Sequence, residues 1–272
     1  MSTGEFRLRI CYEKSGRLRW LSHLETVRAV ERIIRRAGLR FALTKGFNPH
    51  IKVAFGPALP VGTASLCEYM DVWTTRYDEA GLVLALLQAV SPMGLCPVAA
   101  VYIPEREPAL TVALTIGLYR VEVLPVGAGG RVEVGAGAAP VEVGVLEAAL
   151  DELMAFGELT VERRGKKKTY DLSRSIAGDV RITGDGGDGG DGGGDGGKIV
   201  VEIPIRMGPE GALRPEVMIG RVLENVGVGA GAEVGTGAGS GATSGSKALC
   251  ALNVTRTGLF VETDEGTWQR PM

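Results

Sequence analysis

Residues 17–68 decide how the first half of the chain folds, and they read RLRWLSHLETVRAVERIIRRAGLRFALTKGFNPHIKVAFGPALPVGTASLCE. Ser22 and Glu25 form the S-x-x-E pattern of a helix capping box, and apolar residues then recur with helical spacing. Gly38 stands where a helix commonly ends in a left-handed conformation. The stretch therefore predicts an amphipathic helix between Ser22 and Gly38.

Strand patterns flank this helix on both sides. Apolar and polar residues alternate over residues 6–12, which is typical of a half-buried strand. Beyond the helix the same reasoning predicts strands at residues 51–55, 67–74 and 95–103. A second helix is predicted near residues 78–90. The first half of the chain therefore has the order β-α-β-β-α-β.

The second half of the chain predicts the same order again. Strands are expected at residues 112–123, 159–164, 198–205 and 249–256, and helices at 143–156 and 215–225. Gly-rich tracts interrupt this half as loop insertions near residues 127–139, 184–197 and 227–246. We therefore predict an α+β protein of two ferredoxin-like split β-α-β (βαββαβ) units with antiparallel sheets. The predicted domains are residues 1–108 and 109–272.

The composition excludes several classes of protein. No run of 18 apolar residues is present, and the N-terminus lacks the apolar segment of a signal peptide, so we expect a cytoplasmic protein without membrane contact. The four cysteines lie too far apart for a CxxC zinc module or a CxxxCxxC iron–sulfur motif. Walker, GxGxxG, GxSxG and HExxH motifs are absent as well. We expect neither a cofactor nor a metal.

Basic residues concentrate near the N-terminus. Residues 1–60 contain twelve Arg and Lys against four Glu, a net charge of +8, whereas the whole chain has a net charge of −2. Arg28, Arg32 and Arg36 recur every four residues, so they form one row on the polar side of the predicted helix. This arginine row is either an ordinary solvated helix face or a surface that binds phosphate groups of RNA.

Other basic residues extend the predicted RNA surface. Arg7 and Arg9 lie on the face of the first strand opposite its apolar residues, where they are predicted to offer guanidinium groups to phosphate. The loop after the helix adds a second set of phosphate-binding candidates: Lys45, Asn48, His50 and Lys52. A rigid structural loop is the alternative. A later hairpin has a basic tip that includes Lys167, and a solubilising turn is the alternative there.

The chain contains two histidines, His23 and His50. His23 stands at the start of the predicted helix, where the helix dipole favours a neutral imidazole that can act as a general base. Both rings are therefore candidate catalytic groups for metal-free RNA cleavage, and weak candidates for metal ligands. Glu68 and Asp71 are the nearest acidic residues, and salt bridges to the arginines are an equally good interpretation of both.

Two segments, RLRWLSHLETVRAVERIIRRAGL and TKGFNPHIKVAFGPALPVGTASLCEYMDV, resemble the bacterial radical-SAM-linked protein family. A weaker resemblance extends to VERRGKKKTYDLSRSI and LRPEVMIGRVLE. The matching positions are Ser22, His23, Arg28, Arg32, Gly46, Phe47, Asn48, Pro49, His50, Phe55, Gly56, Pro60, Gly62, Ser65 and Glu68. The resemblance implies partnership with a radical S-adenosylmethionine enzyme, in tRNA or ribosome-related modification. Since this chain lacks the cluster-binding cysteines, radical chemistry would belong to another polypeptide.

We therefore expect an accessory protein that binds RNA, or presents substrate, to a radical S-adenosylmethionine enzyme and has no catalytic activity of its own. One alternative is a metal-independent enzyme that processes or modifies RNA with His23 and His50. Another is a protein–protein scaffold that binds no nucleic acid.

Overall fold

The computed structural model describes residues 4–126, 142–163, 165–184, 198–208, 212–231 and 249–272. Within these ranges the chain is a mixed α+β protein with six α-helices and mostly antiparallel strand pairs. It forms two compact units, of which the first comprises Met1–Gly117 and Thr255–Met272 and the second Leu118–Val254. The C-terminal segment therefore returns to the first unit, which the predicted contiguous division after residue 108 does not include.

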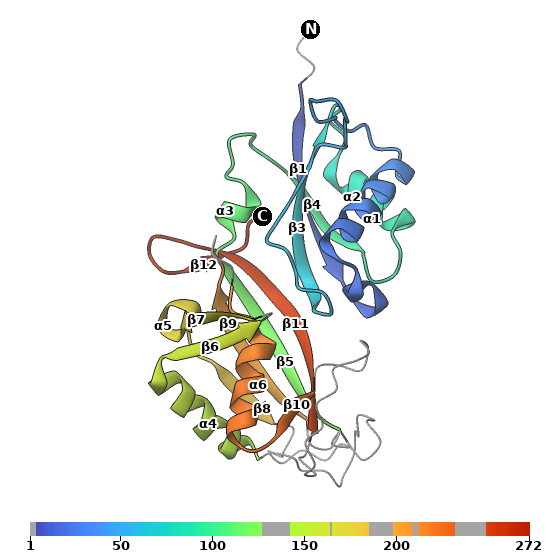
Figure 1. The fold of residues 1–272 in the computed structure, drawn as a ribbon. Helices are drawn as coiled ribbons and strands as arrows, with labels where there is room; N and C mark the ends of the chain where they lie inside the picture. The colour runs from blue at the N-terminus through green and yellow to red at the C-terminus, as the bar shows by residue number, and fades with distance from the viewer. Residues whose placement is uncertain (1–3, 127–141, 164, 185–197, 209–211, 232–248) are drawn as a thin grey trace, which may run out of the picture. The chain divides into compact units, whose positions relative to one another are not determined.

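The first unit has the element order predicted from the sequence. Its elements are β1 (Phe6–Lys14), the 3-10 helix η1 (Gly16–Trp20), α1 (His23–Arg36), β2 (Val53–Phe55), β3 (Ala64–Thr74), α2 (Ala80–Val90), β4 (Pro97–Ile103) and α3 (Leu110–Ala113). The strands lie in the order β4-β1-β3-β2, and each neighbouring pair is antiparallel. Helices α1 and α2 lie on one face of this sheet (Figure 1).

Helix α1 begins and ends where its local sequence predicts. The Ser22 backbone N–H donates to Glu25 Oε2 at 2.8 Å, and the Glu25 N–H donates to Ser22 Oγ at 3.4 Å, which completes the capping box. Gly38 follows the helix with a φ of +69°. The apolar side of α1, including Ile33 and Ile34, packs into the core beneath α1 and α2.

The opposite face of the sheet is not open, which corrects the prediction for Arg7 and Arg9. Both side chains are buried, and both pair with the carboxylate of Asp71, which is 0% exposed. Arg7 Nη2 lies 2.7 Å from Asp71 Oδ2, and Arg9 Nε lies 2.8 Å from Asp71 Oδ1. Neither guanidinium group is therefore available to a phosphate.

Backbone carbonyl groups from distant segments accept further hydrogen bonds from these two arginines. Arg7 donates to the carbonyl oxygens of Glu105, Glu107 and Pro108 at 2.6–3.1 Å. Arg9 donates to the carbonyl oxygen of Pro271 at 2.9 Å. Residues 105–108 and Pro271 therefore cover the sheet face that was predicted to be open.

The C-terminal strands complete the first unit. β11 (Leu249–Glu262) pairs with β3 in parallel at Thr255 and Arg256, and β12 (Trp268–Gln269) pairs with its end. β11 is therefore longer than the predicted strand at residues 249–256. The strand predicted from residue 112 is wrong at its start, because Leu110–Ala113 is helical and β5 begins at Ile116.

The second unit has a different arrangement from the predicted second βαββαβ order. Its elements are β5 (Ile116–Val126), which begins in the first unit, α4 (Val143–Phe156), β6 (Glu158–Arg163), β7 (Lys166–Asp171), α5 (Leu172–Ser175), β8 (Arg181–Gly184), β9 (Ile199–Arg206), α6 (Pro215–Asn225) and β10 (Gly229–Gly231). β9 lies between β5 and β8, whereas β6 and β7 form a separate two-stranded sheet. All but one residue of β7 are exposed, so this strand offers no apolar face to a larger sheet.

Three further predictions concern loops, cysteines and the membrane. Of the predicted Gly-rich loops, residues 127–139, 185–197 and 232–246 lie outside the described residues. The loop predicted to begin at residue 227 is wrong at its start, because Gly229–Gly231 form β10, and Gly184 ends β8. Cys11 and Cys250 are buried and Cys67 and Cys96 are partly buried, all as free thiols. In the part of the chain that the structure describes, no helix is long and apolar enough to cross a membrane.

The paired arginines lead to a stability prediction. We expect Asp71→Asn to lower the free energy of unfolding by about 3–5 kcal/mol, because it leaves two guanidinium groups buried without a counter-ion. Asp78→Asn is the control, since Asp78 pairs with the largely exposed Arg76; that change should cost less than about 1 kcal/mol. Equal losses for the two variants in urea unfolding would contradict the role assigned to Asp71.

Candidate functional site

The arginine row lies on the outer side of α1, as predicted. Arg28, Arg32 and Arg36 are all exposed, and the helix turns its apolar residues inward. Arg28 is near the carboxylate of Glu25, one turn earlier. Arg32 and Arg36 form no ion pair or hydrogen bond with any residue that the structure describes. Their guanidinium groups are therefore accessible to an external anion.

The predicted phosphate-binding loop is exposed at Lys45, Asn48 and His50. Its ends are closed by backbone hydrogen bonds, including Thr44 N–H to His50 O at 2.8 Å. Lys52 differs from the others, because its Nζ lies 2.6 Å from Glu5 Oε2 and 4.6 Å from the centre of the Trp73 ring. Among the described residues, no hydrogen bond or ion pair joins this loop to the arginine row.

Lys167 is exposed on the hairpin of β6 and β7, opposite Glu162. The predicted hairpin at these residues is therefore confirmed. It belongs to the second unit, whereas the other candidates belong to the first.

The two histidines occupy different places in the first unit. His23 begins α1, and its ring packs edge-on against Phe55 with 5.5 Å between ring centres. His50 lies five residues before Phe55 in a largely extended segment. At about 3.3 Å per residue, that segment spans on the order of 15 Å. The structure therefore does not combine the two rings in one acid–base site.

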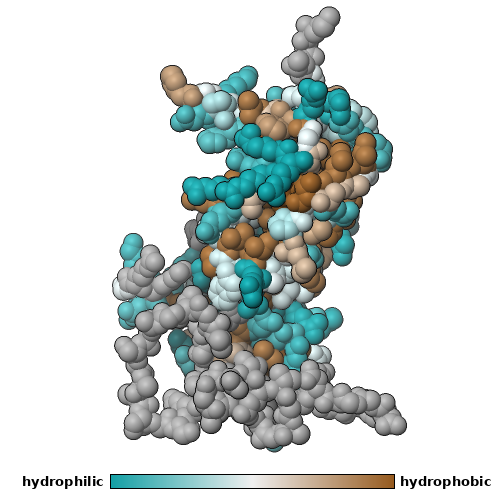
Figure 2. Space-filling view, turned by 90° about the vertical axis from the view of Figure 1, so that its right-hand side faces the viewer, coloured by the Kyte–Doolittle hydropathy of each residue, from teal (hydrophilic) through white to brown (hydrophobic). Residues whose placement is uncertain are grey.

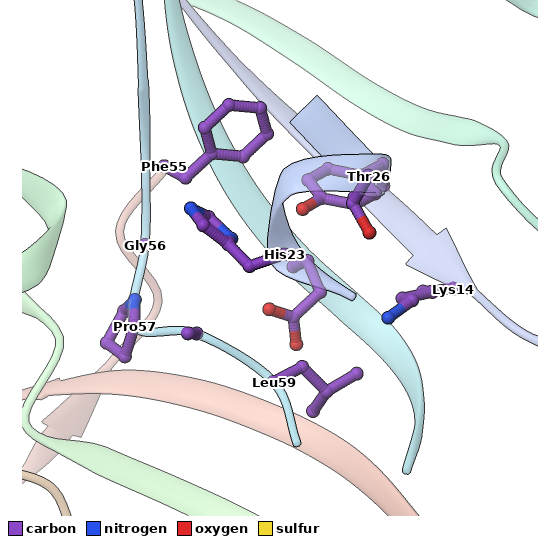
Figure 3. A pocket seen from close by; sticks show the side chains of 10 residues that line it. Lys14, His23, Thr26, Phe55, Gly56, Pro57 and Leu59 are labelled. Carbon is purple, nitrogen blue, oxygen red and sulfur yellow. The ribbon is translucent and has the colours of Figure 1, made fainter. Parts of the chain in front are cut away.

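A small pocket does form beside His23. Its volume is about 20 Å³, which is room for about one water molecule. We call it the α1 pocket, and it is lined by Tyr12, Lys14, His23, Thr26, Phe55, Gly56, Pro57, Ala58, Leu59 and Glu68. Figure 3 shows Lys14 and His23 entering from different elements, with Phe55 and Leu59 on either side. The pocket thus combines a cationic, an aromatic and a carboxylate group.

Strand register explains why three titratable groups meet there. Tyr12 of β1 is directly opposite Glu68 of β3. The register shifts between Tyr12 and Lys14, which pairs with Ser65, and both side chains line the pocket. The Lys14 Nζ donates to the carbonyl oxygen of Leu21 at 2.6 Å. Glu68 accepts two hydrogen bonds from Arg256 Nη1, at 3.0 and 3.2 Å, and Arg256 is 1% exposed.

The salt-bridge interpretation is therefore confirmed for Asp71, while Glu68 also forms a salt bridge but to Arg256, which was not among the predicted partners. Glu68 pairs with Arg256, while Asp71 pairs with Arg7 and Arg9. Across the described residues, no group of three or more His, Cys, Asp or Glu side chains has the arrangement of a metal site.

Burial shifts the pKa values of two groups in the pocket. It raises the pKa of Tyr12 well above its usual range, and the nearby carboxylate of Glu68 adds to this. The phenol is therefore a proton donor at neutral pH. Burial also lowers the pKa of Lys14, because a charged ammonium group loses its hydration there, while Glu68 opposes that effect.

Sequence reasoning missed Tyr12, Lys14 and Arg256 as members of a site. Tyr12 fits the alternation of an ordinary core strand, and Lys14 stands at its end. Arg256 gives the clearest signal, because it is a charged residue at the end of the predicted strand at residues 249–256, which reads LCALNVTR. A buried arginine in such a strand requires an acidic partner.

The loop after β2 is fixed at Gly62, which has a φ of +92° and whose N–H donates to Arg19 O at 3.0 Å. A Cβ atom at this position would lie 2.9 Å from the Trp20 ring. We expect Gly62→Ala to lower the free energy of unfolding by about 1–3 kcal/mol.

The matched control for this prediction is Gly144→Ala. Gly144 is exposed in α4, and no atom lies within 4 Å of a Cβ built there. Because alanine favours helices, this change should be neutral or stabilise by up to about 1 kcal/mol. If chemical denaturation gave the same result for both variants, the loop would not depend on Gly62.

The match to a known protein family covers most of this chain. A comparison with curated proteins finds no significant match. The family model described as "Uncharacterized protein conserved in bacteria (DUF2344)" matches residues 7–215, which include the arginine row and all the residues that line the α1 pocket. The chain therefore belongs to this uncharacterized bacterial protein family.

Proposed function

We propose that the chain is an accessory protein that binds RNA through the exposed face of α1. The observation that carries the proposal is the arginine row, whose members Arg32 and Arg36 are exposed and lack an acidic partner among the described residues. Guanidinium groups bind phosphate oxygens in pairs of parallel hydrogen bonds, and a row of them suits a polyanion. Lys45, Asn48 and His50 are further candidates for contact.

The arrangement of the first unit also supports a ferredoxin-like fold for it. The chain order β1-α1-β2-β3-α2-β4 and the sheet order β4-β1-β3-β2 are both those of a split β-α-β unit. In such a unit, both helices cover one sheet face, so their outer sides face solvent together.

A radical S-adenosylmethionine enzyme is the proposed protein partner, as the resemblance of the sequence implies. The outer side of α2 suits a protein contact, because the helix AGLVLALLQAV has no charged residue and exposes Leu82 and Leu86. Figure 2 shows hydrophobic and hydrophilic side chains gathered next to each other on the side where α1 and α2 lie. Accordingly, RNA and protein would contact neighbouring helices.

The enzyme alternative has less support. It requires His23 and His50 to act on one substrate group, but His23 packs on Phe55 and His50 belongs to a separate exposed loop. A scaffold that binds no RNA is the other alternative, and the same experiment tests it.

The test is binding of total tRNA across a series of salt concentrations. We expect Arg32→Ala and Arg36→Ala each to weaken binding and to reduce the slope of log affinity against log salt by about one unit, as for one lost phosphate contact. Stability should change by no more than about 0.5 kcal/mol, because both residues are exposed. Arg181→Ala, at an exposed position of β8, is the matched control and should bind like wild type.

Two outcomes contradict RNA binding through α1. One is wild-type binding that does not respond to salt, or no binding at all, which favours the scaffold. The other is a loss of tRNA affinity in Arg181→Ala as large as that in Arg32→Ala and Arg36→Ala, which indicates nonspecific charge attraction instead of a surface on α1.

The partner is tested by co-purification after nuclease treatment. We expect a radical S-adenosylmethionine enzyme, co-expressed from the same source, to be retained by wild type and lost with a Leu82→Ser, Leu86→Ser double variant. Val145→Ser is the control, because Val145 is exposed on helix α4. Retention of the enzyme by the double variant would contradict docking through α2.

A further inference from the structure

We propose that the α1 pocket binds a phosphate group, held between Lys14, Tyr12 and the first turn of α1. The proposal rests on the proposed RNA-binding function only for the source of the group, since the same chemistry would accept a terminal phosphate of RNA or a free phosphate. The pocket lies at the start of the helix that bears the arginine row.

Tyr12 is the first observation that points to a ligand. Its side chain lines the pocket and is 5% exposed, yet its hydroxyl has no hydrogen-bond partner among the described residues. The hydroxyl is not among the fully enclosed unpartnered atoms of the described residues, so it opens toward the pocket that Tyr12 lines. Since burial and Glu68 keep it protonated, it would donate its proton to an oxygen atom placed in the pocket.

Lys14 is the second observation. Its ammonium group has three protons, and the structure assigns one hydrogen bond to it, with the carbonyl oxygen of Leu21. The residue is 3% exposed, so bulk water does not fully solvate the charge. An anion in the pocket would supply both an acceptor and a counter-charge.

The first turn of α1 contributes donors on the other side. His23 and Thr26 of this turn line the pocket. In α1 the N–H groups of Glu25 and Thr26 already donate to Ser22, which leaves those of His23 and Leu24 for an external acceptor. The helix dipole there favours an anion. His23 is both exposed and part of the pocket lining, so it can contact the rest of a larger ligand.

The charge balance around the pocket permits an anion despite Glu68. The carboxylate of Glu68 is neutralised by Arg256, which lies 3.0 Å away. Glu25 of the first turn of α1 also acts on Lys14, and Arg28 lies near Glu25. The five groups Lys14, Arg256, Arg28, Glu68 and Glu25 together have a net charge of +1. An anion would therefore meet a local excess of positive charge.

The geometry favours a phosphate over a carboxylate. Donors reach the pocket from β1 and from α1 on different sides, which suits the tetrahedral oxygens of a phosphate better than a flat group. A volume of about 20 Å³ has room for one oxygen atom of the phosphate inside the pocket. The remaining oxygens would stay at the mouth, near His23.

The first experiment is titration of the full chain with inorganic phosphate at constant ionic strength, followed by calorimetry. We expect saturable binding by wild type, about tenfold weaker binding by Tyr12→Phe, and no measurable binding by Lys14→Met, because each change removes a hydrogen bond to a charged oxygen. Tyr77→Phe and Lys198→Met are the controls, at an exposed tyrosine and at a lysine paired with Glu122.

Tyr12→Phe keeps the proposal falsifiable if Lys14→Met does not fold, because it removes a hydroxyl that has no partner in the protein. Its thermal unfolding should match that of wild type. Absence of saturable phosphate binding by wild type would overturn the proposal. Unchanged binding by Tyr12→Phe would overturn it too.

The second experiment identifies the source of the phosphate. A short RNA with a 5′-phosphate is compared with the same RNA without it. Tighter binding of the phosphorylated RNA that is lost in Tyr12→Phe supports a terminal phosphate, whereas binding of inorganic phosphate alone supports a small phosphate ligand. Arg32→Ala should weaken both RNAs and leave inorganic phosphate binding unchanged, so failure of the RNA proposal and failure of the pocket proposal give different results.

Discussion

The carboxylate of Asp71 is the interaction on which the first unit depends most. It is fully buried and pairs with two guanidinium groups, those of Arg7 and Arg9. Through further hydrogen bonds of these arginines, it also connects the sheet to the segment at residues 105–108 and to Pro271. Charges at this depth are stable only as a complete set. The connection after β4 and the C-terminal segment are therefore part of the core, although neither is a strand of the central sheet at these points.

The two faces of the β1–β3 pair carry two separate sets of buried charges. Successive residues of a strand point to opposite faces, so Glu68 and Asp71, three positions apart on β3, lie on different faces. Asp71 faces the covering segments, whereas Glu68 lies on the helix side with Tyr12 and receives Arg256 from β11. The first set is closed by backbone carbonyl groups. The second set borders the α1 pocket, where Tyr12 keeps an unused hydroxyl, and this difference separates a structural cluster from a candidate site.

The sequence predicted what local signals determine and missed what distant segments determine. The capping box, the helix of Pro215–Asn225 and the β6–β7 hairpin follow from neighbouring residues, and all three are confirmed. The burial of Arg7 and Arg9 follows from groups as far as 262 residues away along the chain. Alternation in β1 showed that these arginines point away from the apolar residues, but it cannot show what covers the other face. The buried position of Arg256 was missed for the same reason, because its partner Glu68 lies 188 residues earlier.

The burial of several basic side chains also changes how the net charge of +8 in residues 1–60 should be interpreted. Twelve Arg and Lys occur among residues 1–60, but Arg7, Arg9 and Lys14 are buried and Lys52 pairs with Glu5. These four cations serve the fold or the pocket, so the excess of +8 overstates the charge that an RNA would meet. What remains exposed is concentrated on and just after α1. An RNA contact would accordingly be local and limited to a few phosphates, which agrees better with an accessory that positions an RNA than with a protein that wraps one.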